Sequence, residues 1–298
     1  MQLSLSNIEK SFGEKKVLKQ ISFSAESGEA FGLLGRNGAG KTTSIRILMN
    51  VFPADAGEVL VDSKPIDYSK TKIGYLPEER GLYPKKIIFE QLVYLALLKG
   101  MGKKDAEKSV EYWLERLDMS EYKNKKLDTL SKGNQQKIQL ITALAHDPDI
   151  IILDEPFSGL DPVNAMLLKD VVKEQIAKGK IVLFSSHQMN YIEEFCDRIA
   201  ILNDGQVAVS GRLSDIKRSY PRNRLTVKSQ KNSEIAKAFE NAVFTDDGAL
   251  LIRMHDEAEK SDVMKRLVSE WDVDAVEVFE PTLSDIFVQY AGDAPVEG

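Results

Sequence analysis

One short stretch of the sequence, GRNGAGKT (Gly35–Thr42), has residue types that can bind phosphate. Gly38 and Gly40 let the backbone curl until successive N–H groups point at phosphate oxygens. The Lys41 ammonium can then reach the β- and γ-phosphates, and the Thr42 hydroxyl can bind Mg²⁺. Because an apolar run precedes the loop and a helical pattern follows it, the stretch predicts a phosphate-binding loop at a helix N-terminus rather than a plain glycine turn.

A second group of polar residues follows two other apolar runs. Asp154 and Glu155 come at the end of IIILDEP, and His187 ends KIVLFSSH. Open α/β folds bind ligands at the carboxyl ends of their strands, where Asp154 could hold Mg²⁺ and Glu155 could polarise an attacking water. His187 could hydrogen-bond the γ-phosphate or hold that water. The alternatives are a helix cap or loop charge for the acidic pair, and a histidine satisfied by a loop carbonyl.

A third stretch, LSKGNQQKIQL (Leu130–Leu140), reads as the start of a helix. Ser131 and Gly133 fall in the first turn, where backbone N–H groups have no partner within the helix. Such a helix end attracts anions, yet no anion is evident nearby in the sequence. The residues alone therefore leave open whose negative charge this helix end meets.

The elements that must position these residues alternate along the chain. Three nearly all-apolar runs, within residues 29–35, 149–156 and 180–187, suit strands buried on both faces. Between the last two lies a helical pattern with Asp161 as its cap and Pro162 at its first position, which ends at Gly179. Strand, helix and strand at this length imply a right-handed parallel crossover and an α/β core.

Other segments have a different texture. The first thirty residues alternate apolar and polar side chains, which is typical of half-buried antiparallel strands. Residues from about 80 to 146 predict an all-helical insertion, in which Val110, Trp113, Leu114 and Leu117 share one stripe. From about residue 218 the pattern becomes βαββαβ with a last helix, which predicts a small α+β, ferredoxin-like domain.

Composition limits the class of protein further. The 298 residues carry a net charge of −6, with no basic domain for nucleic acid and no polybasic run for a membrane surface. No apolar run reaches the ~20 residues of a membrane span, and the N-terminus lacks a secretory pattern. A single cysteine, Cys196, rules out an internal disulfide framework. We expect a cytoplasmic chain.

Taken in order, GRNGAGKTT, LSKGNQQK, IIILDEP, SGLD and SSHQM resemble the nucleotide-binding domain of an ABC ATPase. The resemblance covers about the first 215 residues and implies a P-loop NTPase core with a mostly parallel sheet, an antiparallel β subdomain and the helical insertion. We therefore expect an ABC ATPase domain at 1–217 and an accessory or regulatory α+β domain at 218–298. IGYLPEERGLYP and EPTLSDIFVQYAG are similar to the bacterial sodium-efflux-type (NatA-like) ABC ATPases.

The resemblance also answers the question about the third stretch. In ABC ATPases two such domains pair head to tail around two ATP molecules, and the signature helix of one faces the γ-phosphate bound by the other. It implies that this chain contributes in trans Ser131, Lys132, Gly133 and Asn134. Asp161 would run along the dimer seam, although a cap for the helix at Pro162 is compatible with that role.

The remaining site residues are also implied by the resemblance. Catalysis would use Glu155, His187 and Lys41, and the metal would use Thr42, Asp154 and Glu78. The implied ATP-binding residues are Phe12, Val17, Asn37, Gly38, Ala39, Gly40, Lys41, Thr42 and Thr43.

Three positions depart from the family pattern. Lys132 and Asn134 replace a glycine and the glutamine of the signature, and Glu78 replaces a glutamine that contacts Mg²⁺ and the membrane partner. Glu78 could ligate the metal or stay solvated. Phe12 stands where an aromatic ring stacks on adenine, or it simply packs among the strands.

These features together predict an ATP-hydrolysing transporter subunit that uses ATP and Mg²⁺. Its partners would be a second nucleotide-binding subunit, as a homodimer, and separate multi-span permease subunits that dock near Glu78–Tyr94. It would lie on the inner face of the cell membrane through that permease, and family resemblance favours export. The alternatives are a soluble ABC ATPase that acts on nucleic acid or ribosomes, and a kinase- or GTPase-like enzyme. The acidic balance and the signature stretch argue against both, so no nucleic-acid partner is expected.

Overall fold

The computed structural model describes residues 1–78, 81–245 and 248–291. Glu79, Arg80, Asp246 and Asp247 lie outside them. The chain divides into two compact units, one formed by Met1–Arg212 with the chain from Phe287 onward, the other by Leu213–Ile286. The chain passes from the first unit to the second after Arg212, which is before the predicted 217/218 boundary. It returns to the first unit after Ile286, inside the last helix.

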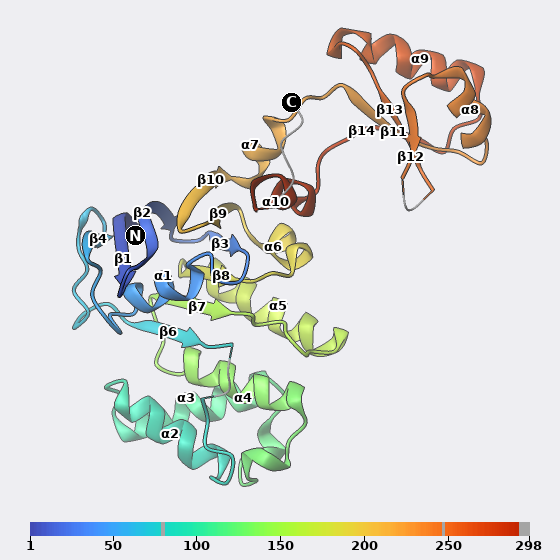
Figure 1. Cartoon of the computed structure of the whole chain (residues 1–298). Helices are drawn as coiled ribbons and strands as arrows, with labels where there is room; N and C mark the ends of the chain where they lie inside the picture. Colours follow the sequence, from blue (N-terminus) through green and yellow to red (C-terminus); the bar gives the residue numbers. More distant parts are fainter. Residues whose placement is uncertain (79–80, 246–247, 292–298) are drawn as a thin grey trace. The chain divides into compact units, whose positions relative to one another are not determined.

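A six-stranded sheet forms the centre of the first unit (Figure 1). Its strands, in spatial order, are β10 (Gln206–Arg212), β9 (Arg198–Asn203), β3 (Ala30–Gly35), β8 (Ile181–Ser185), β7 (Ile150–Asp154) and β6 (Ile73–Leu76). All neighbours are parallel except the β9–β10 hairpin. Every residue of β3, β7 and β8 is buried, which confirms the apolar runs as strands covered on both faces.

A four-stranded antiparallel sheet packs against α1 and the central sheet, next to the phosphate-binding loop. Its strands are β2 (Lys15–Glu26), β1 (Gln2–Phe12), β4 (Ala56–Val61) and β5 (Lys64–Pro65), in that order. One hydrophobic core contains side chains from β1 and β2, from α1 (Lys41–Leu48) and from the central strands β3, β7, β8 and β9. The loop between β3 and α1 is thus anchored at both ends in a shared core.

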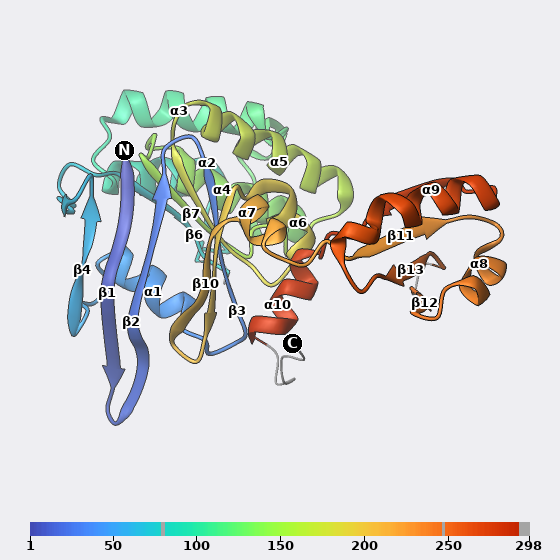
Figure 2. The same ribbon diagram turned by 90° about the horizontal axis from the view of Figure 1, so that it is seen from above.

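The helical insertion is present as predicted. It comprises α2 (Ile88–Leu98), α3 (Lys103–Arg116), the short 3-10 turns η1 (Ser120–Tyr122) and η2 (Leu127–Thr129), and α4 (Lys132–Leu144). Both views group α2, α3 and α4 together (Figures 1 and 2). The predicted stripe on α3 is buried: Val110, Trp113 and Leu114 are at most 5% exposed. The remaining helices of this core are α5 (Pro162–Ala177) and α6 (Met189–Phe195).

Strand β6 was not evident from the sequence pattern. It has only four residues and lies at the edge of the sheet, where a short alternating pattern gives little signal. The backbone of Gly74 passes so close to α4 that a Cβ there would lie 2.1 Å from the carbonyl oxygen of Ala143. This contact fixes the strand that leads directly to Glu78.

The second unit follows the predicted βαββαβ order. After α7 (Leu213–Arg218) come β11 (Arg224–Lys228), α8 (Asn232–Ala238), β12 (Ala242–Phe244), β13 (Leu250–Arg253), η3 (Glu257–Glu259), α9 (Lys260–Glu270) and β14 (Ala275–Val278). The four strands pair antiparallel in the order β12-β13-β11-β14, and the unit has its own hydrophobic core. The last helix, α10 (Leu283–Ala291), crosses the division between the units.

Candidate functional site

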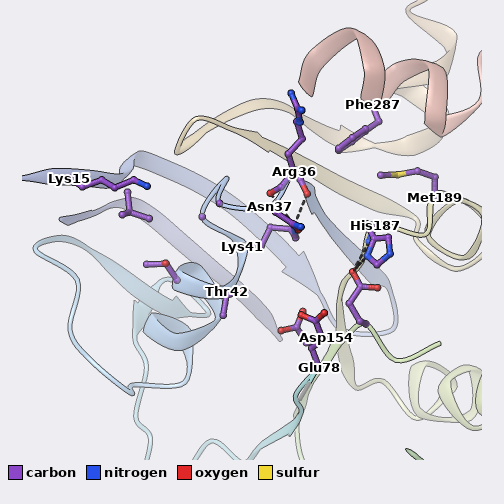
Figure 3. A pocket seen from close by; sticks show the side chains of 16 residues that line it. Lys15, Arg36, Asn37, Lys41, Thr42, Glu78, Asp154, His187, Met189 and Phe287 are labelled. Carbon is purple, nitrogen blue, oxygen red and sulfur yellow. Dashed lines mark hydrogen bonds and ion pairs between the residues drawn. The ribbon is translucent and has the colours of Figure 1, made fainter. Parts of the chain in front are cut away.

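A cavity of about 730 Å³ opens in the first unit where the phosphate-binding loop meets the carboxyl ends of β7 and β8 (Figure 3). Most of the predicted catalytic, metal-binding and ATP-binding residues lie together there, although they are far apart in the sequence. The predicted residues that line it are Val17, Asn37, Gly38, Gly40, Lys41, Thr42, Thr43, Glu78, Asp154, Glu155 and His187. The position of the cavity is the one expected for a ligand of an open α/β sheet.

The phosphate-binding loop has the backbone that its glycines allow. Gly38 has φ 84° and Gly40 has φ 111°, both in the left-handed region that side chains disfavour. Helix α1 begins directly at Lys41 and has no acidic side chain in its first turn, so its N-terminal N–H groups remain available to an anion. The Lys41 Nζ donates hydrogen bonds to the carbonyl oxygens of Gly35 at 2.6 Å and Arg36 at 3.3 Å.

Charge balance within the cavity centres on Lys41. Burial lowers the pKa of its ammonium, and the negative charges of Glu155, Asp154 and Glu78 act in the opposite direction. The Lys41 ammonium therefore lies within the field of three carboxylates, and a bound nucleotide must share it with them.

The carboxylates of Asp154 and Glu78 lie side by side below Thr42 (Figure 3). Burial raises the pKa of Asp154, and the neighbouring charges of Glu78 and Glu155 raise it further. Tyr75 donates to Asp154 Oδ2 at 3.5 Å, and burial together with this carboxylate raises the pKa of Tyr75 to about 12. Asp154 and Glu78 share the single charge of Lys41 with Glu155, so two carboxylates crowded beside a hydroxyl fit a hard divalent cation.

Glu155 and His187 are held against each other. Glu155 is 5% exposed and has a positive φ of 49°, which turns it out of the line of β7. Its Oε1 accepts hydrogen bonds from the His187 backbone N–H at 2.8 Å and from His187 Nδ1 at 2.6 Å. Because a carboxylate oxygen can only accept, Nδ1 carries a hydrogen in this arrangement. The His187 side chain is otherwise 66% exposed, so its Nε2 edge can reach a ligand.

The signature stretch forms the predicted helix start. Ser131 is the N-cap of α4, and its Oγ accepts from Asn134 N–H at 3.3 Å. A Cβ on Gly133 would lie 3.3 Å from Asn164 Nδ2 and 4.0 Å from Asp161 Oδ2, so the signature and SGLD stretches are neighbours. None of residues 131–134 is among the described residues that line the cavity.

Asp161 is a helix cap, as the alternative interpretation predicted. Its Oδ1 accepts the Asn164 backbone N–H at 3.0 Å, and its Oδ2 accepts the Asn164 amide. These hydrogen bonds lower the pKa of the Asp161 carboxyl. The cap leaves Asp161 exposed beside Gly133, so a role at a dimer seam is compatible with it.

Two predicted ATP-binding residues do not line the cavity. Phe12 is 50% exposed and meets Phe52 edge-on, with the ring centroids 5.5 Å apart. Ala39 is 6% exposed because its methyl group belongs to the hydrophobic core beneath the loop. Any stacking of adenine on Phe12 would therefore take place outside the cavity walls.

Five lining residues were not among the predicted site residues: Lys15, Gly35, Arg36, Met189 and Phe287. Arg36 belongs to the loop, and Met189 follows His187 closely, so proximity to known motifs could have suggested both. Lys15 is exposed at the start of β2, where its residue type by itself indicates only a solvated charge. Phe287 comes from α10 and lies within EPTLSDIFVQYAG, a stretch that indicated the family resemblance but gave Phe287 no role in the site.

Comparisons with known proteins agree with this geometry. Residues 18–158 match the family model of the ABC transporter. Over 97% of this chain and 98% of its relative, the sequence is 42% identical to the uncharacterized ABC transporter ATP-binding protein YhaQ of Bacillus subtilis (strain 168). The chain belongs to the ABC transporter ATP-binding proteins. The family membership confirms the prediction, made from the sequence motifs, that the chain is an ATPase.

Further similarities extend to both units of this ABC ATPase. Residues 211–291 match the C-terminal domain of DrrA1-3-like ATP-binding proteins. NatA of Bacillus subtilis (strain 168) is 33% identical over 72% of this chain and 91% of its own length, in line with the NatA-like features noted in the sequence. The solved structure entitled "Dimeric Structure of MJ0796, a Bacterial ABC Transporter Cassette" superposes with a TM-score of 0.63 at 27% identity, covering 71% of this chain and 98% of that one. Among the described residues, no helix combines the length and apolar character of a membrane span.

Proposed function

We propose that two copies of this ABC ATPase close head to tail around two ATP–Mg²⁺ molecules and drive export through separate permease subunits. The observation that carries the proposal is the division of the anion-binding groups on one chain. The phosphate-binding loop, the acidic pair and His187 share one cavity, whereas the helix start at Ser131 lies outside its walls. A second chain can supply that helix start across the open side of the cavity.

The residues near Thr42 fit a magnesium ion that arrives with the nucleotide. Thr42, Asp154 and Glu78 would hold it, and the remaining ligands would come from phosphate oxygens and water. Mg²⁺ in such a site neutralises the charge that develops on the β- and γ-phosphates. Asp154 and Glu78 would then gain a positive neighbour, which would oppose the burial and the negative charges that raise the pKa of Asp154.

The nucleotide takes over hydrogen bonds that the loop now makes to itself. Lys41 leaves the carbonyl oxygens of Gly35 and Arg36 and turns to the β- and γ-phosphates. Glu155 accepts a proton from the attacking water, and His187 presents its exposed Nε2 edge to the γ-phosphate. The N-terminus of α4 from the second copy completes the site with Ser131 and the N–H groups near Gly133.

Coupling to the membrane needs a surface beside this site. Exposed apolar side chains lie on the segment that follows Glu78 and on α2: Tyr83, Tyr94, Leu97 and Leu98. Their position after Glu78 would link permease docking to the nucleotide. We infer that the permease holds the ATPase at the inner face of the membrane, and that the region at 218–298 serves as an accessory or regulatory module.

The Glu155→Gln variant tests the arrangement. We expect it to bind ATP–Mg²⁺ normally, to lose at least about 99% of its turnover, and to accumulate as a dimer, since the proton acceptor is gone while the sandwich remains. Light scattering coupled to size exclusion, with and without ATP–Mg²⁺, measures the dimer directly.

The matched control adds Ser131→Arg to the same chain. This change places a bulky side chain at the start of α4 and leaves the cavity of its own chain untouched, so nucleotide binding should persist while the dimer disappears. A Glu155→Gln chain that stays monomeric with saturating ATP–Mg²⁺, both alone and with its permease, contradicts the proposal.

A further inference from the structure

Ser186 has a buried contact with Glu155 that the site motifs do not explain. It follows β8, is 1% exposed, and is not among the described residues that line the nucleotide cavity. Its Oγ lies 2.8 Å from Glu155 Oε2 and 3.0 Å from the backbone nitrogen of Gln188. A hydroxyl in this position cannot bind the nucleotide itself, so any role in catalysis must act through Glu155.

The direction of these hydrogen bonds follows from their chemistry. The Gln188 backbone N–H can only donate, so the Ser186 oxygen is the acceptor in that bond. The hydroxyl hydrogen of Ser186 then remains for the carboxylate, which can only accept. Ser186 is therefore fixed as a donor to Glu155 Oε2, and free rotation of the hydroxyl would break one of the two bonds.

The remaining contacts of Glu155 identify the oxygen that can react. Its Oε1 accepts two hydrogen bonds, both from His187, which uses the two lone pairs of that oxygen. In the part of the chain that the structure describes, Oε2 accepts only the bond from Ser186. The open lone pair of the carboxylate is thus on Oε2, the atom that Ser186 holds in place.

We propose that Ser186 is a positioning residue of the ATPase reaction, which orients Glu155 Oε2 toward the attacking water. The inference rests on the proposed role of Glu155 as proton acceptor. The water oxygen bonds to the γ-phosphorus, the bond from this phosphorus to the β–γ bridging oxygen breaks, and its electron pair leaves with ADP. One proton of the water passes to Glu155 Oε2 and later to the released phosphate.

Without the Ser186 hydroxyl, the carboxylate is held at one oxygen only. It can then pivot about Oε1, which moves the open lone pair of Oε2 away from the line of attack. Displacements of about 1 Å in such groups reduce turnover by roughly 100-fold. Because ATP contacts other residues, its binding should not change.

A pair of isosteric variants isolates the hydroxyl from the shape of the side chain. Ser186→Thr and Ser186→Val add the same volume, but only threonine keeps a donor. We expect threonine to keep kcat within about threefold of wild type and valine to lower it by roughly 10- to 100-fold. KM for ATP and the affinity for a fluorescent ATP analogue should stay within about twofold for both.

A serine elsewhere in the same unit provides the control. Ser109 Oγ donates to the carbonyl oxygen of Ala145 at 2.6 Å, away from the cavity, so Ser109→Ala removes one hydrogen bond without touching the site. We expect normal kcat for this variant. Equal losses of kcat in Ser186→Thr and Ser186→Val would overturn the proposal, because shape rather than the donor would then be responsible.

A double-mutant cycle separates this inference from the proposed function. If Ser186 acts through Glu155, adding Ser186→Val to Glu155→Gln should cause no further loss of residual turnover. A further loss as large as in the wild-type background means that Ser186 acts independently of Glu155. Full turnover of the Glu155→Gln single variant would instead refute the role of Glu155 itself.

Discussion

At the residue scale, burial is the main cause of the pKa shifts of Lys41 and Asp154 in the site. His146, just before the β7 region, shows the same physics outside the cavity: it is 3% exposed, and its Nε2 lies 3.1 Å from the carbonyl oxygen of Ile73. Burial is the main cause that lowers the pKa of this imidazole, and Lys99 and Lys72 lower it further, while the Ile73 carbonyl and Asp147 act against them. The folded protein therefore keeps His146 neutral at a pH where the unfolded chain would protonate it.

The sign of the resulting pH dependence follows from proton binding. An unfolded histidine has a pKa of about 6.5, so below this pH the unfolded chain takes up a proton that the folded chain refuses. We expect the free energy of unfolding to fall as the pH drops below 6.5, with a contribution from His146 of at most about 1.4 kcal/mol per pH unit.

His146→Gln should reduce that slope, since glutamine keeps a donor for Ile73 and does not titrate. Urea unfolding between pH 5 and pH 7.5 measures the two slopes. Identical slopes in the variant and the wild type would show that other groups cause the acid sensitivity.

At the scale of elements, the short edge strand β6 connects the helical insertion to the end of the cavity that holds Glu78 and Asp154. It pairs in parallel with β7, and Gly74 lets it pass against α4 at a distance that no side chain allows. Glu78 follows this strand by two residues and reaches Asp154 at the neighbouring strand end. Movement of the insertion would therefore be passed to Glu78 through β6.

Gly74→Ala tests how tightly this element is packed. The new methyl group would meet the carbonyl oxygen of Ala143 at 2.1 Å and Pro148 Cγ at 2.9 Å, so strand and helix must separate. We expect the free energy of unfolding to decrease by about 1–3 kcal/mol, as measured in urea. Gly81→Ala is the matched control because a Cβ there has no atom within 4 Å. Equal stability of the two variants would contradict the close approach.

At the scale of the whole molecule, the proposed dimer requires each copy to contribute two different halves of an ATP site. One half is the cavity, which contains Lys41. The other half is the start of α4, which contains Ser131 and, at Gly133, lies next to Asp161. A head-to-tail dimer joins unlike halves twice, so two different defects on two chains should leave one intact site per mixed dimer.

Mixing Lys41→Ala chains with Ser131→Arg chains therefore restores activity that neither variant has alone. Each mixed dimer has one of its two sites intact, so it should turn over ATP at about half the rate of a wild-type dimer if the sites are independent. A phosphate-release assay on the mixture, with each variant alone as the control, measures this. No gain on mixing would contradict the exchange of halves between chains.

The sequence by itself determined the parts of this protein whose signal is local. The buried strands around the phosphate-binding loop, the position of Asp154 at the end of β7 and the helix start at Ser131 were all predicted correctly. Each depends on hydrophobic periodicity or on residue types at short fixed spacing, which the chain carries wherever it folds. The order of strands and helices in the second unit was predictable for the same reason.

The tertiary structure alone decided which residues, distant in the sequence, line the same cavity. It also decided which hydrogen-bond donors contact the Glu155 carboxylate. Phe287 lines the cavity and Phe12 does not, and the donor that holds Glu155 Oε2 is Ser186, to which the sequence motifs assigned no role. These contacts depend on how β3, β7, β8 and the neighbouring helices pack together. Packing sets the distances between atoms of different elements, and these distances cannot be calculated from the spacing of residues along the chain.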